Sequence, residues 1–230
     1  MLFLPLHALL AQPTTYPALK QRIAVDRLAF ATRYASADSV HRVALVDSAR
    51  NYLFDRITLD ILPAWHGTPW DFNGTTRTPG SGTIACGYFV NTVLQDAGFT
   101  LPRIKWSQMA AEPITVKLCH RIKRFRDGPV SDVITYIRSQ GDGLYKVGLD
   151  NHVGFIVARN GVVRFVHSNY YQRAIGVMSE PLDGTTCCSI YATAWWVLCS
   201  TMRCRDAHHG ASGYCGCRVM SEYRRLHSTI

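Results

Sequence analysis

The sequence has no long hydrophobic run. No stretch of its 230 residues approaches the roughly 18–20 consecutive apolar residues that span a bilayer, which excludes a polytopic membrane protein. Charged residues are scarce, at 18% against 47% hydrophobic residues, and disorder needs the opposite balance. No internal repeat of about 20–50 residues is visible, which argues against a solenoid. The length therefore predicts one domain, with or without an appendage, whose function sits in a cleft.

Acidic residues are outnumbered, since 16 Asp and Glu stand against 25 Lys and Arg and the net charge is +9. This balance favours anionic partners such as nucleic acid, acidic lipid or cell-wall polymer, although a solvated basic surface gives the same count. The one dense basic run, over residues 117–126, has no RNA-binding or zinc-finger signature beside it. We therefore predict no nucleic-acid partner and at most a peripheral association with membranes.

The N-terminal segment 1–17 lacks the basic residues that usually begin a secretory signal. Its short apolar core and the small residues after it nevertheless resemble such a signal. A buried N-terminal segment is the alternative interpretation. We expect export, and hence a secreted, periplasmic or cell-envelope location.

Cysteine is rare before residue 187 and frequent after it. Residues 1–186 contain only Cys86 and Cys119, whereas residues 187–230 contain six. This change in composition marks 187–230 as a separate tail. Disulfides, a zinc site of unusual spacing, or a sequence foreign to the domain all remain open for it. If Cys86 is a free thiol, seven cysteines remain, and an odd number cannot all pair within one chain.

Hydrophobic periodicity predicts helices in the first part of the chain and strands in the second. The helices are expected over 18–34, from Ser39 to a stop at Pro63, from Cys86 to Gly98, and over 129–140, with a loop rich in Gly and Pro over 64–85. The strands are expected over 144–148, 152–158, 162–167 and 174–178. Helices followed by an antiparallel meander predict an α+β fold. The domain would span 18–186, with a helical part (18–63) and a core (64–186).

Cys86 follows the Gly-rich loop and begins a predicted helix. A helix N-terminus carries about half a positive charge and unpaired N–H groups. These groups stabilise a thiolate and can bind the oxyanion of a tetrahedral intermediate. A lone cysteine is more often structural, so its position alone does not establish a nucleophile.

His152 opens a strand whose other residues are apolar or Gly, so its ring needs a polar partner. With Asn160-Gly161 as the hairpin loop, His152 faces Asn169, whereas a loop at Arg159-Asn160 puts it opposite His167. Either register supplies a polar group on the same face of the sheet. A nucleophile at a helix start, a base on a strand and an orienting group on the next strand form the arrangement of papain-like catalysis.

Three segments in this order carry a more specific pattern. They are Gly67-Thr68-Pro69-Trp70-Asp71-Phe72-Asn73-Gly74 followed by Ala85-Cys86-Gly87-Tyr88-Phe89-Val90, then Asn151-His152-Val153-Gly154-Phe155-Ile156-Val157, and Val163-Arg164-Phe165-Val166-His167-Ser168. Together they resemble the NlpC-type cell-wall peptidase family of the papain-like clan, over roughly residues 64–180. The resemblance implies a papain-like fold with helices packed on an antiparallel sheet. It also implies Cys86 as nucleophile, His152 as base and His167 as the orienting residue, while the turn argument favours Asn169.

The sequence departs from the family pattern at three positions of the first two of these segments. Trp70 stands where the family has a Tyr near the oxyanion site, Ala85 replaces an Asp, and Gly87 replaces a Ser. Trp can still donate through its indole N–H. Trp70 and Tyr171 are the best candidates for a substrate groove, together with Asn73 of the same Gly-rich loop.

The resemblance implies a cysteine hydrolase that cleaves stem-peptide amides of peptidoglycan. Cys86 would attack the carbonyl, His152 would shuttle the proton, and water would resolve the acyl-enzyme. This chemistry needs no metal and no organic cofactor, and we expect a monomer. An amidase, or a thioesterase or acyltransferase of the same clan, is the alternative enzyme. A non-catalytic cell-envelope binding module is the alternative from another class.

Overall fold

A computed structural model describes residues 15–184 and 196–202 of the chain. The helices are α1 (Tyr16–Ser36), α2 (Ser39–Asp55), α3 (Leu62–Trp65), α4 (Cys86–Asp96), α5 (Arg103–Ser107), α6 (Ala111–Leu118) and α7 (Val130–Gln140), with a π-helical segment η1 (Arg56–Ile61) between α2 and α3. The strands are β1 (Cys119–Phe125), β2 (Gly143–Gly148), β3 (Val153–Arg159), β4 (Val162–Ser168), β5 (Val177–Pro181) and β6 (Trp196–Met202). The predicted α+β class is confirmed.

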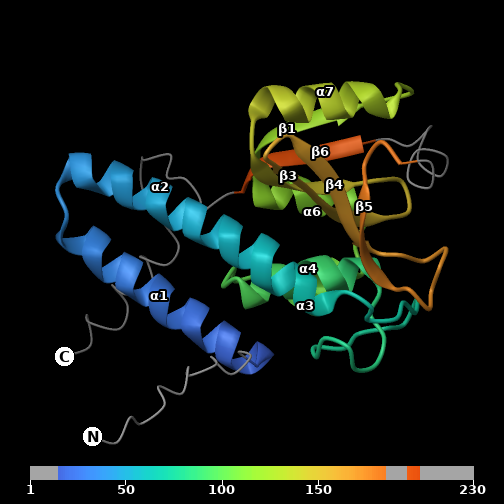
Figure 1. Ribbon diagram of the computed structural model, residues 1–230, viewed down its shortest axis with the longest axis horizontal. Coiled ribbons are helices and arrows are strands. Elements are labelled where there is room, and N and C mark those ends of the chain that lie inside the picture. The colour runs from blue at the N-terminus through green and yellow to red at the C-terminus, as the bar shows by residue number, and fades with distance from the viewer. Residues whose placement is uncertain (1–14, 185–195, 203–230) are drawn as a thin grey trace, which may run out of the picture.

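The described strands form one antiparallel sheet in the order β1-β6-β2-β3-β4-β5. Strands β2 to β5 are a simple meander, whereas β6 enters between β1 and β2 (Figure 1). No described helix is both long and apolar enough to cross a membrane.

Side chains alternate along each strand, so the sheet has two apolar faces with a core on each. One core packs α4, α6 and the helical N-terminal part against Val153, Phe155 and Val166. The other packs α7 against the opposite face, where Ile156 and Phe165 lie. Figure 1 shows α7 on one side of the sheet and α4 and α6 on the other. The candidate site lies where α4 meets the beginning of β3.

The helical N-terminal part is a pair of long helices that projects from the sheet region in Figure 1. Helix α1 begins at Tyr16, so the predicted N-terminal segment 1–17 ends two residues too late, and its signal-like portion lies outside the described residues. The predicted stop at Pro63 is wrong, because the chain stays helical to Trp65. A proline has no N–H to donate within a helix, and the wider π-helical turns of η1 directly before it accommodate that missing bond.

The predicted domain boundary at residue 186 is wrong for part of the tail. Strand β6 comes from the region 187–230 and bonds to β1 on one side and β2 on the other. At least residues 196–202 therefore belong to the sheet and are not foreign to it. The other predictions for the tail lie outside the described residues.

Strand β5 also begins later than predicted, because the N–H groups of Ile175 and Gly176 bond to Gln172 in a turn.

The β3–β4 hairpin has the two-residue loop Asn160-Gly161. Both loop residues have positive φ, at 52° and 77°, as a type I′ turn requires. Arg159 pairs with Val162, so the register is the one that the Asn-Gly pair predicts. Continued past Phe155 and Val166, it sets Gly154 opposite His167.

Candidate active site

The Gly-rich loop before α4 is held by hydrogen bonds from both sides. Ile84 donates its N–H to Pro69 (2.9 Å), and Ala85 donates to Gly74 (2.9 Å). A Cβ on Gly74 would lie 2.6 Å from the Ile84 nitrogen, so only glycine permits this approach. The Ser168 hydroxyl at the end of β4 donates to the Ile84 carbonyl (2.7 Å). These contacts fix the point at which α4 begins, and hence the position of Cys86.

Cys86 is the first residue of α4, and no side chain caps the helix there. The backbone N–H groups of Val153, Gly87 and Cys86 itself lie near its sulfur and favour the thiolate. The thiol thus lies beside Val153, the first residue of β3, which directly follows His152 in the sequence. Gly87 has no room for the serine of the family pattern, because a Cβ would lie 2.6 Å from the Ser107 carbonyl oxygen.

Burial raises the pKa of the Cys86 thiol and outweighs the three N–H groups that lower it. Burial also lowers the pKa of His152 well below the usual range, and the neighbouring His167 lowers it further. The expected thiolate at the helix start is therefore disfavoured in the resting protein. Both shifts favour a neutral thiol beside a neutral imidazole at neutral pH.

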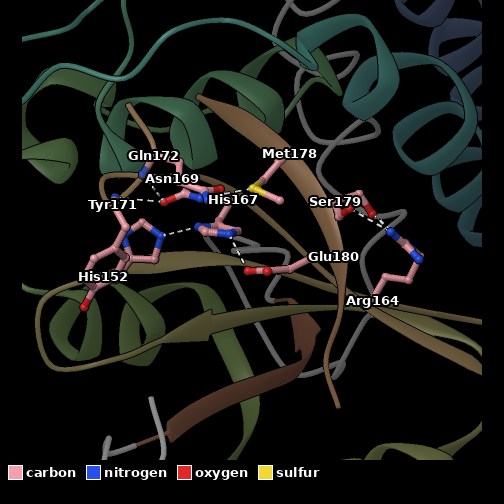
Figure 2. A network of polar contacts seen from close by, with 9 residues as sticks. All are labelled: His152, Arg164, His167, Asn169, Tyr171, Gln172, Met178, Ser179 and Glu180. Atoms are coloured by element: carbon pink, nitrogen blue, oxygen red, sulfur yellow. Dashed lines mark hydrogen bonds and ion pairs between the residues drawn. The ribbon is translucent and has the colours of Figure 1, made fainter. Parts of the chain in front are cut away.

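His152, His167 and Glu180 form a buried chain of hydrogen bonds, which Figure 2 shows. Nε2 of His152 lies 2.8 Å from Nδ1 of His167, and Nε2 of His167 lies 2.9 Å from Oε1 of Glu180. The three residues are 3%, 1% and 8% exposed. In the observed registers each contact is diagonal, one from β4 to the residue before β3 and one from β4 to β5. Long side chains on one face reach such diagonal neighbours.

The Glu180 carboxylate, at the end of this series of hydrogen bonds, determines which ring nitrogen of each histidine carries the proton. A carboxylate only accepts hydrogen bonds, so His167 carries its proton on Nε2 and its Nδ1 is an acceptor. His152 must then carry its proton on Nε2 and donate it to His167. The nitrogen of His152 that can take up a proton is therefore Nδ1. Glu180 thus sets the tautomer that a general base at His152 needs.

Gly154 and Phe165 make the contact between the two histidines possible. A Cβ on Gly154 would lie 2.5 Å from the Phe165 ring and 2.9 Å from the Val166 carbonyl oxygen. The Phe165 ring stacks on His167, with centroids 4.3 Å apart and planes at 14°. The absent side chain at Gly154 leaves the space in which these rings pack.

Cys86 and His152 line one pocket of about 170 Å³. Its wall also includes Asn91 and Ser107 of the α4–α5 region, Ala111 of α6, Lys146 of β2, and Asp150 of the β2–β3 turn. Tyr170 lies beside this site, with its ring centroid 5.1 Å from that of His152. Within the described residues, no three His, Cys, Asp or Glu side chains lie close enough together to hold a metal ion.

Asn169 does not take the orienting role that the turn argument gave it. Its Oδ1 accepts the N–H groups of Tyr171 (2.8 Å) and Gln172 (3.1 Å), and its amide nitrogen contacts the Met178 sulfur (3.1 Å). The amide thus closes the loop after β4, as asparagine commonly does in turns. The observed register does set Asn169 opposite His152, but His152 bonds to its diagonal neighbour His167 instead.

The predicted substrate-binding residues separate into two groups. Trp70 contacts Tyr170 (ring centroids 6.1 Å apart), and the Tyr170 hydroxyl donates to that of Tyr171, so these residues adjoin the site. The indole N–H of Trp70 is buried and has no partner among the described residues. Asn73 instead is exposed in a turn, where its N–H bonds to Asp71, and it does not line the pocket.

Sequence reasoning missed Glu180 and Lys146. A glutamate in the apolar stretch 177–182 was a signal for the first, because a buried carboxylate needs a partner. Lys146, in the apolar strand 143–148, was the same kind of signal. Its side chain is 0% exposed.

Comparison with known proteins adds no relative, because no family model, no curated protein and no solved structure matches this chain.

Proposed function

We propose that this protein is a cysteine hydrolase that cleaves amide bonds, with Cys86 as nucleophile and His152 as general base. The observation that carries the proposal is the 2.8 Å contact between His152 and His167, because His152 lines the same pocket as Cys86. Nucleophile, base and orienting group come from α4, the start of β3, and β4. Covalent catalysis by cysteine needs these three roles.

The reaction begins from the neutral pair. As the Cys86 sulfur attacks the amide carbonyl, its proton moves to Nδ1 of His152 and a carbon–sulfur bond forms. The backbone N–H groups at the start of α4 would stabilise the oxyanion. When the carbon–nitrogen bond breaks, the imidazolium gives its proton to the leaving amine. Water then hydrolyses the thioester with His152 as base, which restores the Cys86 thiol.

His167 and Glu180 support the base and do not touch the reacting atoms. The carboxylate holds His167 in one tautomer, and His167 holds His152 with Nδ1 available to exchange a proton. The Glu180 charge also stabilises the imidazolium that forms during attack.

The resemblance to NlpC-type peptidases supports the stem-peptide amides of peptidoglycan as substrate and a papain-like fold. A net charge of +9 suits an anionic wall polymer. Location outside the cytoplasm belongs to the same proposal. Cys119 is disulfide-bonded, which is common in oxidising compartments and rare in the cytosol.

The test is digestion of purified peptidoglycan, with released fragments identified by mass spectrometry. Cys86→Ser should abolish release, because serine lacks a comparably accessible anion. His167→Ala should lower the rate by roughly 10²–10⁴, as expected for losing the group that orients the base. Asn169→Ala is the matched control and should cost much less.

Two outcomes would overturn parts of the proposal. Undiminished release by Cys86→Ser would remove the nucleophile, and a larger loss in Asn169→Ala than in His167→Ala would remove the assigned orienting residue. Wild-type protein that binds peptidoglycan without releasing fragments would favour a binding module.

A further inference from the structure

Lys146 is a buried cation in the wall of the pocket that holds Cys86. Its side chain is 0% exposed, and its ammonium donates to the Thr115 hydroxyl (2.6 Å) and the Ala111 carbonyl (3.3 Å). Both acceptors are neutral and belong to α6. No carboxylate of the described residues forms an ion pair with Lys146. A lysine ammonium has three N–H donors, so one remains beyond these two bonds.

This arrangement is unfavourable for the folded protein on its own. Lysine is almost never fully buried unless it is paired. The absence of an anionic partner among the described residues, in a cavity that also holds a nucleophile, indicates that the partner is a ligand. Desolvation lowers the pKa of Lys146 to about 7, so the resting group is poised between its charged and neutral forms. An anion bound beside it would stabilise the charged form.

We infer that Lys146 is the anion-binding residue of this pocket, and that the ligand carries a carboxylate close to the carbonyl group that Cys86 attacks. The first part stands on the pocket alone, and the second rests on the proposed function. The substrate class is thus an amide with a free carboxylate near the scissile bond. A neutral amide of the same size would bind without this contact.

Few other ionisable side chains of the described residues line this pocket. Cys86 and His152 contribute the thiol and the imidazole, and the exposed Asp150 contributes a carboxylate at the rim. From the described residues of α6 and β3, the groups beside Lys146 are neutral, namely Ala111, Thr115 and Phe155, which pairs with it across the sheet. On the other side of β2, the backbone register pairs Lys146 with Cys199 of β6. Lys146 is therefore the cation that a carboxylate would meet.

Two alkylating reagents of nearly the same size test the inference without any turnover. Iodoacetate carries a carboxylate and iodoacetamide is neutral, and both react with the Cys86 thiolate. The ratio of their rate constants therefore cancels the thiolate fraction. Modification is read at the Cys86 peptide by mass spectrometry, because the chain has eight cysteines. Reduced glutathione supplies the reference ratio.

At pH 6 the ratio of the iodoacetate and iodoacetamide rate constants, each protein's value divided by that of glutathione, should be roughly tenfold higher in the wild type than in Lys146→Met. A factor of this order is expected for the attraction between two close opposite charges in a partly buried site. Lys146→Gln should match Lys146→Met. The control is Lys117→Met, which removes an exposed lysine of α6 and the same net charge, and it should keep the wild-type ratio.

Equal ratios in the wild type and in both Lys146 variants would overturn the inference. Should neither variant fold, the wild type decides alone. Its preference for iodoacetate should fall between pH 6 and pH 9, as Lys146 loses its proton, and a preference that is absent or constant with pH would overturn the inference. Neither readout depends on amide hydrolysis, so a failed peptidoglycan assay leaves this result intact.

Discussion

Replacing Lys146 by methionine should stabilise the protein, and the gain should depend on pH. A pKa lowered from 10.5 to about 7 in the folded state corresponds to about 5 kcal/mol of lost stability while the unfolded chain keeps its lysine charged. Methionine has a similar length and no charge to desolvate. Thr115 keeps a partner in the variant, because its own hydroxyl donates to the Ala111 carbonyl (2.8 Å).

The sign follows from the direction of the shift. Between about pH 7 and pH 10.5 the unfolded chain binds more protons than the folded one, so the penalty from Lys146 is full below pH 7 and disappears as the pH rises to 10.5. Urea unfolding at pH 6.5 should therefore show Lys146→Met more stable by about 3–5 kcal/mol, with little difference near pH 10.5. A variant that is less stable at pH 6.5, or a gain that is constant with pH, would refute the reasoning.

Three further predictions concern the site and the sheet. As the pH falls below about 6.5, the free energy of unfolding of the wild type should decrease by up to about 1.4 kcal/mol per pH unit, because His152 is buried in its neutral form and its pKa is lowered. His152→Gln should flatten that slope, as measured by urea unfolding at pH 5 and pH 7. Gly154→Ala should push the Phe165 ring against His167 and reduce turnover at least about tenfold while circular dichroism stays native, whereas full activity would contradict the steric argument. Truncation after residue 186 removes β6 and should lower the melting temperature by about 10 °C or more in scanning calorimetry, and an unchanged value would show that the sheet does not need this strand.

Much of the site was predictable because its signals are local. The helix at Cys86 follows from a Gly-rich loop and a periodic apolar pattern. The hairpin follows from Asn160-Gly161, whose positive φ values few other residue pairs adopt. Both features depend on neighbours in sequence, which a single chain reveals.

The missed features depend on contacts between distant segments. Glu180 reaches His167 only because β5 pairs with β4 in one register, and no local pattern specifies that pairing. Burial of Lys146 depends on α6 covering β2, about thirty residues away along the chain. The lowered thiolate content of Cys86 has the same origin, since helix position is visible in the sequence and desolvation is not.

The position of β6 has a consequence for how the chain acquires its shape during synthesis. Strands β2 to β5 pair with their sequence neighbours and can form as soon as they emerge, because short loops close at little entropic cost. Strand β1 pairs within the described residues only with β6, whose pairing closes a loop of about seventy residues. The Cys86 helix and the histidine hairpin are therefore made well before the strand that flanks β2 arrives. The pocket wall that carries Lys146 gains its last neighbouring strand only when residues 196–202 leave the ribosome, so the nascent chain holds its nucleophile and its base before it holds a finished pocket.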